Sequence, residues 1–190
     1  MAFKLLSSFA KTTTLTVYAD YVNNKVFRCL NSLYAYLMAN NIIPVPDCET
    51  FAKAISLALK AHEGQVDKSG MPYAGHIMRV MATGRTMDEK IVGVQHDVVE
   101  DTGWTFDTLL DEGFQVHIVD ALRCVTKLSD NEPYDEFIER VKTNPLAVAV
   151  KINDLADNMD IRRYKELSNW DIKRLKKYLK AYQDLTKGYK

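Results

Sequence analysis

A short stretch of the sequence, residues 91–102, combines apolar positions with side chains that could bind a metal and move a proton. With residues placed about 100° apart around a helix axis, its one imidazole and three carboxyl groups fall within an arc of roughly 140°. They belong to His96, Asp97, Glu100 and Asp101. Burying these groups together is unfavourable unless a cation compensates the negative charge. The stretch therefore predicts a metal site in which His96 and Asp97 are adjacent ligands.

The competing interpretation of this stretch is a solvated helix face, where charged residues usually lie. A metal site also needs further ligands, and two other apolar segments supply them. His76 lies in a helix expected over residues 73–83, and Asp154 lies in a helix expected over residues 146–158. A single buried histidine is more often structural, so the prediction depends on the joint occurrence. The combination predicts a divalent ion such as Mn²⁺ or Zn²⁺, held by His76, His96, Asp97 and Asp154.

Two acids follow the adjacent ligands by one helical turn. From there Glu100 and Asp101 could orient or deprotonate a water that the metal activates. The alternative is a pair of acids near a helix end, although the helix dipole disfavours acids at a C-terminus. Asn158, one turn after Asp154, could hold a water, a ribose hydroxyl or a phosphate oxygen, or could simply end its helix. Lys151 lies one turn before Asp154.

The composition excludes several classes of protein. The chain of 190 residues has 25 Lys and Arg against 25 Asp and Glu, so we expect no general nucleic-acid binding, although a local basic pocket stays open. Its three cysteines are widely spaced, which favours reduced residues over a disulfide framework. No apolar run approaches the roughly 20 residues of a membrane span, and residues 1–10 lack a signal-peptide pattern. We expect a cytoplasmic protein without a membrane partner.

Helical periodicity dominates the chain, so the predicted fold is all-α. Residues 1–45 predict an N-terminal helical extension, whose apolar stripe could support a homo-oligomer. Residues 46–190 predict one domain, with helices at residues 47–62, 73–83, 86–103, 105–110, 114–125, 134–141, 146–158 and from 169 onward. The inward stripe of the last helix is predicted to be Ile172, Leu175, Leu179, Tyr182 and Leu185. Its solvated face is predicted to carry Lys173, Arg174, Lys176, Lys177 and Lys180.

Four segments form a specific set of motifs. They are residues 61–76 (AHEGQVDKSGMPYAGH), 96–102 (HDVVEDT), 125–127 (VTK) and 151–159 (KINDLADNM). In order and spacing they resemble the HD-domain hydrolases of the RelA/SpoT type, most of all the small stand-alone members. The likeness covers about residues 47–186.

This resemblance implies an HD-type helical bundle that binds Mn²⁺ through the four predicted ligands. It implies Glu100 and Asp101 as the pair that activates water, and Asn158 as a nucleotide contact. The family reaction removes pyrophosphate from the 3′ position of (p)ppGpp, the nucleotide of the stringent response. We expect Lys68, Lys151, Arg162 and Arg163 to be candidates for neutralising phosphate. Alternative substrates are an adenine analogue of (p)ppGpp, NADPH or a pyrophosphorylated tRNA end. A non-catalytic module that binds a nucleotide or a protein partner is the remaining alternative, and the presence of both acids counts against it.

The chain departs from the family pattern at several positions. Asp67 stands where the (p)ppGpp hydrolases usually have an Arg that helps to hold the nucleotide. Leu155 and Asp160 also replace arginines that many members carry, and the arginines and lysine of residues 162–165 could restore this charge. An acid near a polyphosphate should weaken binding, so we expect weaker or altered selectivity relative to those enzymes.

Overall fold

The structure is a computed structural model that describes residues 48–129 and 131–187. The predicted N-terminal extension of residues 1–45, with its stripe from Tyr18 to Leu37, lies outside the described residues. In order, the elements are α4 (Cys48–Ala61), α5 (Ala74–Thr83), α6 (Met87–Gln95), α7 (Val98–Asp101), α8 (Phe106–Asp111), α9 (Val116–Val125), α10 (Tyr134–Lys142), α11 (Pro145–Asn158), the 3₁₀ helix η1 (Ile161–Arg163) and α12 (Asn169–Lys187). In these two ranges extended pairing is limited to one bridge, between Val66 and Pro72, so the predicted all-α class is confirmed.

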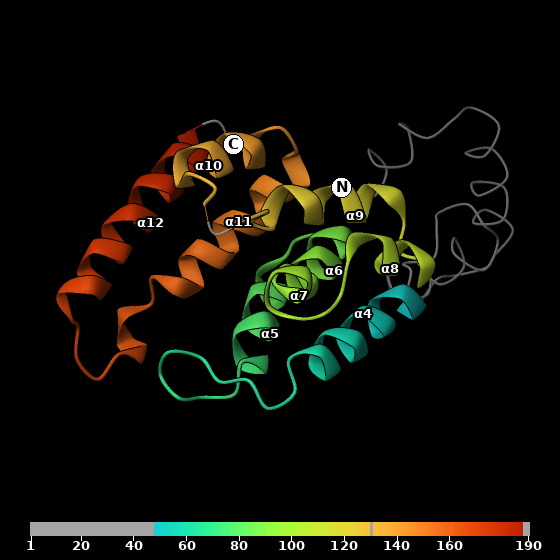
Figure 1. Ribbon diagram of the computed structural model, residues 1–190, viewed down its shortest axis with the longest axis horizontal. Helices are drawn as coiled ribbons and strands as arrows, with labels where there is room; N and C mark the ends of the chain where they lie inside the picture. Colours follow the sequence, from blue (N-terminus) through green and yellow to red (C-terminus); the bar gives the residue numbers. More distant parts are fainter. Residues whose placement is uncertain (1–47, 130, 188–190) are drawn as a thin grey trace, which may run out of the picture. The chain divides into compact units, whose positions relative to one another are not determined.

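Helix α6 occupies the centre of the domain and contacts α4, α5, α9 and α11 (Figure 1). The close crossing with α5 needs Gly93, because a Cβ atom there would lie 3.3 Å from the Cα atom of Met81. Around α6, the fully buried side chains come from several helices and include Ile77, Val92, Val94, Leu122, Val150 and Leu155. The core therefore fixes the faces of α5, α6 and α11 that carry the predicted ligands. In the described part of the chain, none of the helices has the length and apolar composition needed to cross a bilayer.

The helix predicted over residues 86–103 is interrupted in the structure. Helix α6 ends at Gln95, and α7 begins at Val98 after Asp97 adopts φ −104° and ψ −1°. At the break, Nδ1 of His96 donates to the carbonyl oxygen of Gly93 at 2.8 Å. In a continuous helix that oxygen would accept from the amide of Asp97, so the imidazole replaces a backbone donor. The single arc predicted for the four polar side chains is therefore wrong, because they do not lie on one continuous helix.

The buried stripe of α12 also differs from the prediction. Arg174, Ala181 and Leu185 are buried, whereas Ile172 and Leu179 are 41% and 47% exposed. The buried positions recur at helical spacing, but the first of them is a charged residue. A stripe predicted from apolar residues alone cannot include it and therefore falls on a different face of the helix. Arg174, predicted on the solvated face, is thus part of the interior.

Predicted helix starts agree with the structure at two places. The Asn144 side chain accepts hydrogen bonds from the amides of Leu146 and Ala147, with Pro145 in the first turn of α11. At the start of α12, the amide of Asp171 donates to Oγ of Ser168, and the amide of Ser168 donates to the Asp171 carboxylate. Both caps satisfy amides that the helix itself leaves without partners.

Candidate metal centre

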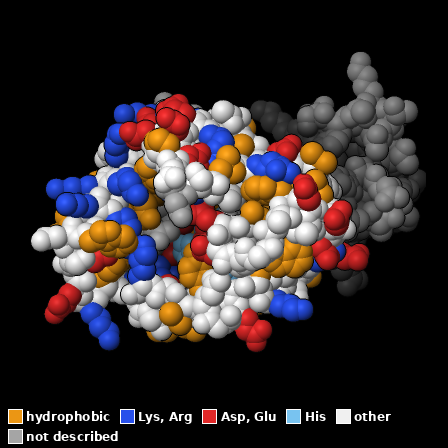
Figure 2. All heavy atoms as spheres, viewed as in Figure 1, with side chains coloured by type: hydrophobic (Ala, Val, Ile, Leu, Met, Phe, Trp, Pro, Cys, Tyr) orange, Lys and Arg blue, Asp and Glu red, His pale blue; other side chains and the backbone are white. Residues whose placement is uncertain are grey.

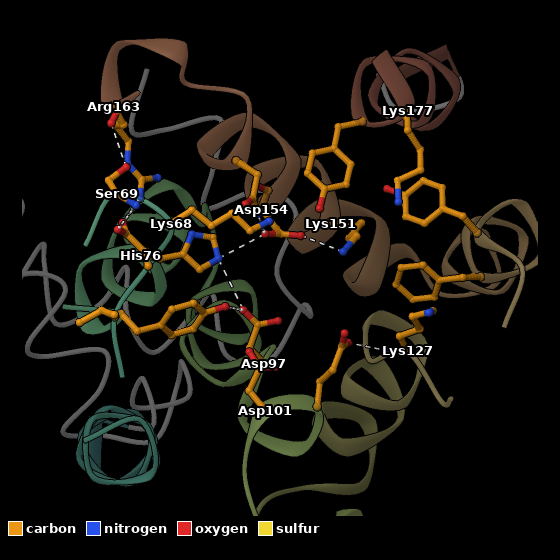
Figure 3. Close-up of a pocket in the computed structure, with 18 of the residues that line it drawn as sticks. Lys68, Ser69, His76, Asp97, Asp101, Lys127, Lys151, Asp154, Arg163 and Lys177 are labelled. Atoms are coloured by element: carbon orange, nitrogen blue, oxygen red, sulfur yellow. Dashed lines mark hydrogen bonds and ion pairs between the residues drawn. The ribbon is translucent and has the colours of Figure 1, made fainter. Parts of the chain in front are cut away.

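Four side chains from three segments meet at one point in the domain. His76 comes from α5, His96 and Asp97 come from the break between α6 and α7, and Asp154 comes from α11. Nε2 of His96 lies 2.9 Å from Oδ2 of Asp97 and 3.4 Å from Oδ1 of Asp154. Nε2 of His76 lies 3.5 Å and 3.3 Å from the same two oxygens. The structure thus brings together all four residues that the sequence predicts as ligands, and Figure 3 shows three of them, His76, Asp97 and Asp154.

Hydrogen bonds to the outer nitrogens orient the two imidazoles. Nδ1 of His76 donates to Asp157 at 2.7 Å, and Nδ1 of His96 donates to the Gly93 carbonyl. Each ring therefore directs Nε2 toward the common point, where the two nitrogens lie 3.2 Å apart. A histidine that binds a metal through one nitrogen usually donates the other N–H to a carboxylate or carbonyl oxygen, which is the arrangement found here.

The donor set fits a divalent ion. Ligand atoms about 2.1 Å from one ion and at right angles around it are about 3 Å apart, close to the separations between these nitrogens and oxygens. His76, His96 and Asp97 together satisfy this spacing, and the Asp154 oxygen lies beside both imidazoles. Mixed imidazole and carboxylate ligands suit Mn²⁺ or Zn²⁺.

The electrostatics of the cluster also favour a cation. Burial opposes the charged form of His76, but Asp154, Asp157 and Asp97 outweigh it and raise its pKa to about 11. Burial likewise opposes charge on His96, while Asp97 and Asp154 raise its pKa to about 9. The same imidazoles, with Lys151 beside Asp154, keep the pKa values of both carboxyl groups below their usual range although burial raises them. The carboxylates thus attract positive charge to the point where the imidazole nitrogens meet.

Tyr73 supports the cluster from the loop before α5. Its hydroxyl donates to Oδ2 of Asp97 at 2.5 Å, and burial together with Asp97 raises the pKa of this phenol well above its usual value. The Tyr73 ring also lies tilted against the His62 ring and in a T-shaped contact with the His76 ring. His62 in turn pairs with Gln65 at 2.8 Å, and this hydrogen bond braces the start of the loop.

The two predicted acid–base residues lie at the rim of the cluster. Glu100 and Asp101 both line the cavity next to Asp97. One carboxylate oxygen of Glu100 accepts from the amide of Lys127 at 2.8 Å, which leaves its other oxygen for a different partner. Burial, followed by the neighbouring Asp97, raises the pKa of Asp101; burial and Asp97 likewise outweigh the Lys127 hydrogen bond and raise the pKa of Glu100. A carboxyl group with a raised pKa is a better proton acceptor near neutral pH.

The cluster forms the floor of a cavity of about 590 Å³, a size typical of a small-ligand site. Figure 2 shows histidine inside this hollow, with acidic and basic side chains around its mouth. Its walls carry aromatic rings and cationic side chains, namely Tyr73, Tyr134, Phe137, Tyr164 and Tyr178, and Lys68, Lys127, Lys151, Arg163 and Lys177. Acids at the floor and cations along the walls would suit a metal ion together with an anionic ligand.

Three lysines of the wall come from different segments. Lys151 donates to Asp154 at 2.8 Å, and its ammonium group lies 4.9 Å from the centre of the Phe137 ring. Lys177 lies 4.3 Å from the centre of the Tyr134 ring, and burial together with the cations Lys127, Arg174 and Lys151 lowers its pKa. Because the neighbouring cations disfavour the charged form of Lys177, an anion that binds among them would be stabilising.

Arg174 is a buried cation beside this wall. It is 6% exposed, and it lies 4.8 Å from the Trp170 ring and 5.7 Å from the Tyr178 ring. Its Nη2 donates to the Tyr164 hydroxyl, and Asp171 lies 3.7 Å away. Within residues 48–129 and 131–187, its Nε and Nη1 atoms have no hydrogen-bond partner. Unpaired buried donors are costly, and Arg174 lies behind Tyr164 and Tyr178 of the wall rather than among the residues that line the cavity.

Of the residues predicted to contact the substrate, some line the cavity and one does not. Lys68, Lys151 and Asn158 line it, and the Asn158 amide donates to the Asp154 carboxylate at 2.6 Å. Arg162 is not among the lining residues: its side chain is 87% exposed and pairs with Asp160 at 2.7 Å. The neighbouring Arg163 turns into the cavity instead, because one residue in the 3₁₀ turn of η1 rotates the side chain by about 120°.

Sequence reasoning missed Lys127, Lys177 and the aromatic walls as cavity residues. Lys127 belongs to the motif at residues 125–127 but was given no role. Lys177 was hidden by the wrong stripe for α12. The signal that would have found it is the series Arg174, Tyr178, Ala181 and Leu185, whose spacing defines the buried face and places Lys177 at its edge.

Comparisons with known proteins agree with this geometry. No protein-family model matches the chain. Over 135 residues, 64% of the chain, it is 29% identical to "Probable GTP pyrophosphokinase" of Mycobacterium leprae, and over 132 residues, 61% of the chain, it is 30% identical to "GTP pyrophosphokinase" of Myxococcus xanthus. In both cases the chain spans only 17% of the relative's length.

The fold is similar to that of a solved structure titled "A metazoan ortholog of SpoT hydrolyzes ppGpp and plays a role in starvation responses". The TM-score is 0.61 at 22% sequence identity, over 72% of this chain and 84% of that chain. This likeness shows that the described domain has the same HD-type helical fold.

Proposed function

We propose that this protein is a metal-dependent phosphohydrolase that removes pyrophosphate from the 3′ position of (p)ppGpp. The observation that carries the proposal is the meeting of two imidazole nitrogens and two carboxylates on the floor of a cavity with cationic walls. The similarity to GTP pyrophosphokinases and the fold shared with a ppGpp hydrolase support the choice of a guanine nucleotide.

In this proposal His76, His96, Asp97 and Asp154 hold Mn²⁺. A divalent ion lowers the pKa of a bound water and polarises a phosphoryl oxygen. Glu100 and Asp101 orient the water and accept its proton as the oxygen attacks the phosphorus next to the 3′ oxygen. The bond between that phosphorus and the 3′ oxygen breaks, the 3′ oxygen takes up the proton from these acids to become a hydroxyl, and pyrophosphate is released with the oxygen of the water. Attack and departure require neutralised phosphate charge, for which Lys127, Lys151 and Lys177 lie in the cavity wall.

Binding of the rest of the nucleotide would use the aromatic walls. Tyr134, Tyr164 and Tyr178 present ring faces or edges to the cavity, while Lys68 lies 5.1 Å from the Trp170 ring at its rim. Asn158 offers an amide beside Asp154 for a ribose hydroxyl. This combination fits a base, a sugar and two phosphate chains better than a simple phosphate ester.

A substrate panel with purified protein and Mn²⁺ tests the proposal. The panel contains ppGpp, pppGpp, the adenine analogue, NADPH and a pyrophosphorylated RNA end, with release of pyrophosphate or phosphate as the readout. Pyrophosphate release from ppGpp that is lost in Asp97→Ala but retained in His117→Gln supports it, because His117 pairs with Asp88 at the surface. Turnover of another member alone would transfer the activity to that substrate.

Synthesis of ppGpp needs a separate experiment, because the similar proteins are named pyrophosphokinases. ATP and GTP are incubated with the protein and Mg²⁺ or Mn²⁺, and formation of ppGpp is measured. Synthesis without hydrolysis would overturn the proposed direction. Saturating metal without turnover of any substrate in either direction would favour a nucleotide-binding module.

A further inference from the structure

Asp157 contacts the metal cluster from its outer side. It lies three residues after Asp154 on α11, and its carboxylate accepts from Nδ1 of His76 at 2.7 Å. The two carboxylates of one helix therefore contact the two nitrogens of the same imidazole, with Asp154 3.3 Å from Nε2. Neither spacing nor composition marked Asp157, because it is one of several acids in the segment.

Two arginines share the Asp157 carboxylate. Nε of Arg79 donates to one oxygen at 2.6 Å, and Nη1 of Arg163 donates to the other at 2.7 Å. Side-chain exposure of Asp157 is 11%, so these bonds are partly shielded from water. They compensate a second negative charge next to the cluster. Burial raises the pKa of Asp157, but the hydrogen bonds from His76 and Arg79 outweigh it and lower this pKa below its usual range.

Arg163 continues the network to the loop between α4 and α5. Its Nη2 contacts the carboxylate of Asp67, and its backbone oxygen accepts from the Ser69 hydroxyl at 2.8 Å. The other oxygen of Asp67 accepts from the amides of Ser69 and Met71 at 2.8 Å and 3.0 Å, which closes the loop. Asp67 is therefore a buried organiser of the loop, with an 8% exposed side chain, rather than an exposed acid facing a phosphate.

We propose that Asp157 is a positioning residue for the metal ligand His76, and that Arg163 couples this residue to the substrate loop through Asp67. The proposal rests on the proposed function only for its effects on turnover. Asp157 holds the His76 ring in the orientation that presents Nε2 to the ion, which is how outer carboxylates act at histidine metal sites. Arg163 pairs with both Asp157 and Asp67, which belong to distant segments. The conformation of the loop between α4 and α5 and the orientation of the His76 ring therefore depend on the same side chain.

Metal binding gives the first test, without substrate. Mn²⁺ affinity is measured by competition with a chelator for the full-length wild-type protein, Asp157→Ala and Asp157→Asn. Loss of an outer partner typically weakens metal binding about 10–100-fold, which we expect for Asp157→Ala. Asp157→Asn keeps an oxygen that can accept from Nδ1 and should recover most of the affinity. Exposed Asp120 provides the matched control, Asp120→Ala.

Nitrogen-15 NMR of the histidines separates positioning from a loss of fold. In the wild-type protein and Asp157→Asn loaded with Zn²⁺, a diamagnetic ion that keeps the ligand signals visible, we expect His76 to carry its proton on Nδ1, and in Asp157→Ala we expect a mixture of ring states. Unfolding of Asp157→Ala would be evident from the other histidine signals, in which case Asp157→Asn and Asp157→Ser at the same site supply the comparison. Wild-type affinity and an unchanged His76 spectrum in a folded Asp157→Ala protein would overturn the positioning role.

A double-mutant cycle tests the coupling. Asp67→Asn preserves the oxygen that accepts from the loop amides but removes the charge next to Arg163. We expect it to raise KM by about threefold or more, and to have no further effect in an Arg163→Gln background. Arg163→Gln alone should raise KM and lower the affinity for Mn²⁺. Additive effects of the two substitutions would overturn the coupling. If wild-type protein binds Mn²⁺ but hydrolyses nothing, the proposed function fails, whereas the affinity and NMR results still decide the role of Asp157.

Discussion

The Nε2 atoms of His76 and His96 lie 3.2 Å apart, and neither ring can turn away without losing a hydrogen bond at Nδ1. With both outer nitrogens protonated, the two inner lone pairs face each other. Such a pair is stable only with a proton or another cation at that point. This relationship defines the competition between protons and metal in the cluster.

That competition predicts a metal effect on stability that grows with pH. Charged His76 and His96 stabilise the metal-free fold fully below about pH 6.5, their unfolded pKa. The contribution is lost as pH rises through about 9 for His96 and about 11 for His76. Mn²⁺ needs neutral rings, so its binding strengthens over the same range. We expect the increase in Tm with saturating Mn²⁺ to be larger at pH 8.5 than at pH 6.

Thermal unfolding at several pH values, with Mn²⁺ and with chelator, checks this expectation. His117→Gln is the control, because it removes an exposed histidine that pairs only with Asp88 in the described part of the chain. Asp97→Ala should abolish the metal effect at every pH. An equal Tm increase at pH 6 and pH 8.5 would show that the ion does not displace protons from these rings.

The two acids at the rim should affect turnover without affecting metal binding. Glu100→Gln and Asp101→Asn keep the shape of each side chain but cannot accept a proton. Loss of a positioned acid–base group typically lowers kcat about 10²–10⁴-fold. Because burial raises both pKa values, wild-type kcat/KM should fall on the acid side at a pH above that expected for exposed carboxylates. Steady-state rates and chelator competition provide the measurements, and wild-type rates in both variants would remove these acids from the mechanism.

Much of the site could be predicted from the sequence because its ligands interrupt apolar helices. His76, His96, Asp97 and Asp154 each stand out against buried neighbours, and the structure places them together. A helix projection could not predict the break at His96. There the imidazole N–H donates to the Gly93 carbonyl oxygen, which in a continuous helix would accept from the Asp97 amide. The predicted arc was wrong for that reason, although Glu100 and Asp101 still reach the cavity.

Side-chain packing and the direction of individual residues in a turn account for most of what the sequence did not predict. Arg174 looked like one of several cations on a solvated helix, and only packing against Tyr164, Trp170 and Tyr178 makes it an interior residue. Arg162 and Arg163 are equivalent in sequence, and the 3₁₀ turn decides which of them faces the cavity. The homo-oligomer, the cytoplasmic location and the helical extension over residues 1–45 stay predictions.

Replacing Arg174 should separate binding from stability. Its unpaired donors are buried, and a buried charge without full compensation can be exchanged for an apolar side chain at little cost in stability. We expect Arg174→Met to keep or raise Tm while KM for the nucleotide rises, because Tyr164 and Tyr178 of the cavity wall lose the guanidinium that they contact. Exposed Lys173 supplies the matched variant, Lys173→Met, with an unchanged KM. A lower Tm with an unchanged KM would make Arg174 a structural residue.

The last prediction concerns Asp67, the position where the resemblance to hydrolases of the RelA/SpoT type leads one to expect an arginine. If the side chain faced the substrate, Asp67→Arg would improve binding of a polyphosphate. In the structure its oxygens instead accept from the amides of Ser69 and Met71 and pair with Arg163. An arginine there loses all three contacts and places two cations together, so we expect Asp67→Arg to lower Tm and to raise KM.

Asp67→Asn distinguishes the two effects, because its side-chain oxygen can still accept from the loop amides. It should change Tm less than Asp67→Arg does, since only the ion pair is lost. Steady-state kinetics and thermal unfolding of the two variants, compared with Lys68→Gln at the adjacent position, provide the measurement. A lower KM in Asp67→Arg at unchanged Tm would mean that the loop turns this residue toward the nucleotide when substrate binds. The absence of the family arginine would then limit activity, and the Asp67–Arg163 pair would belong only to the substrate-free protein.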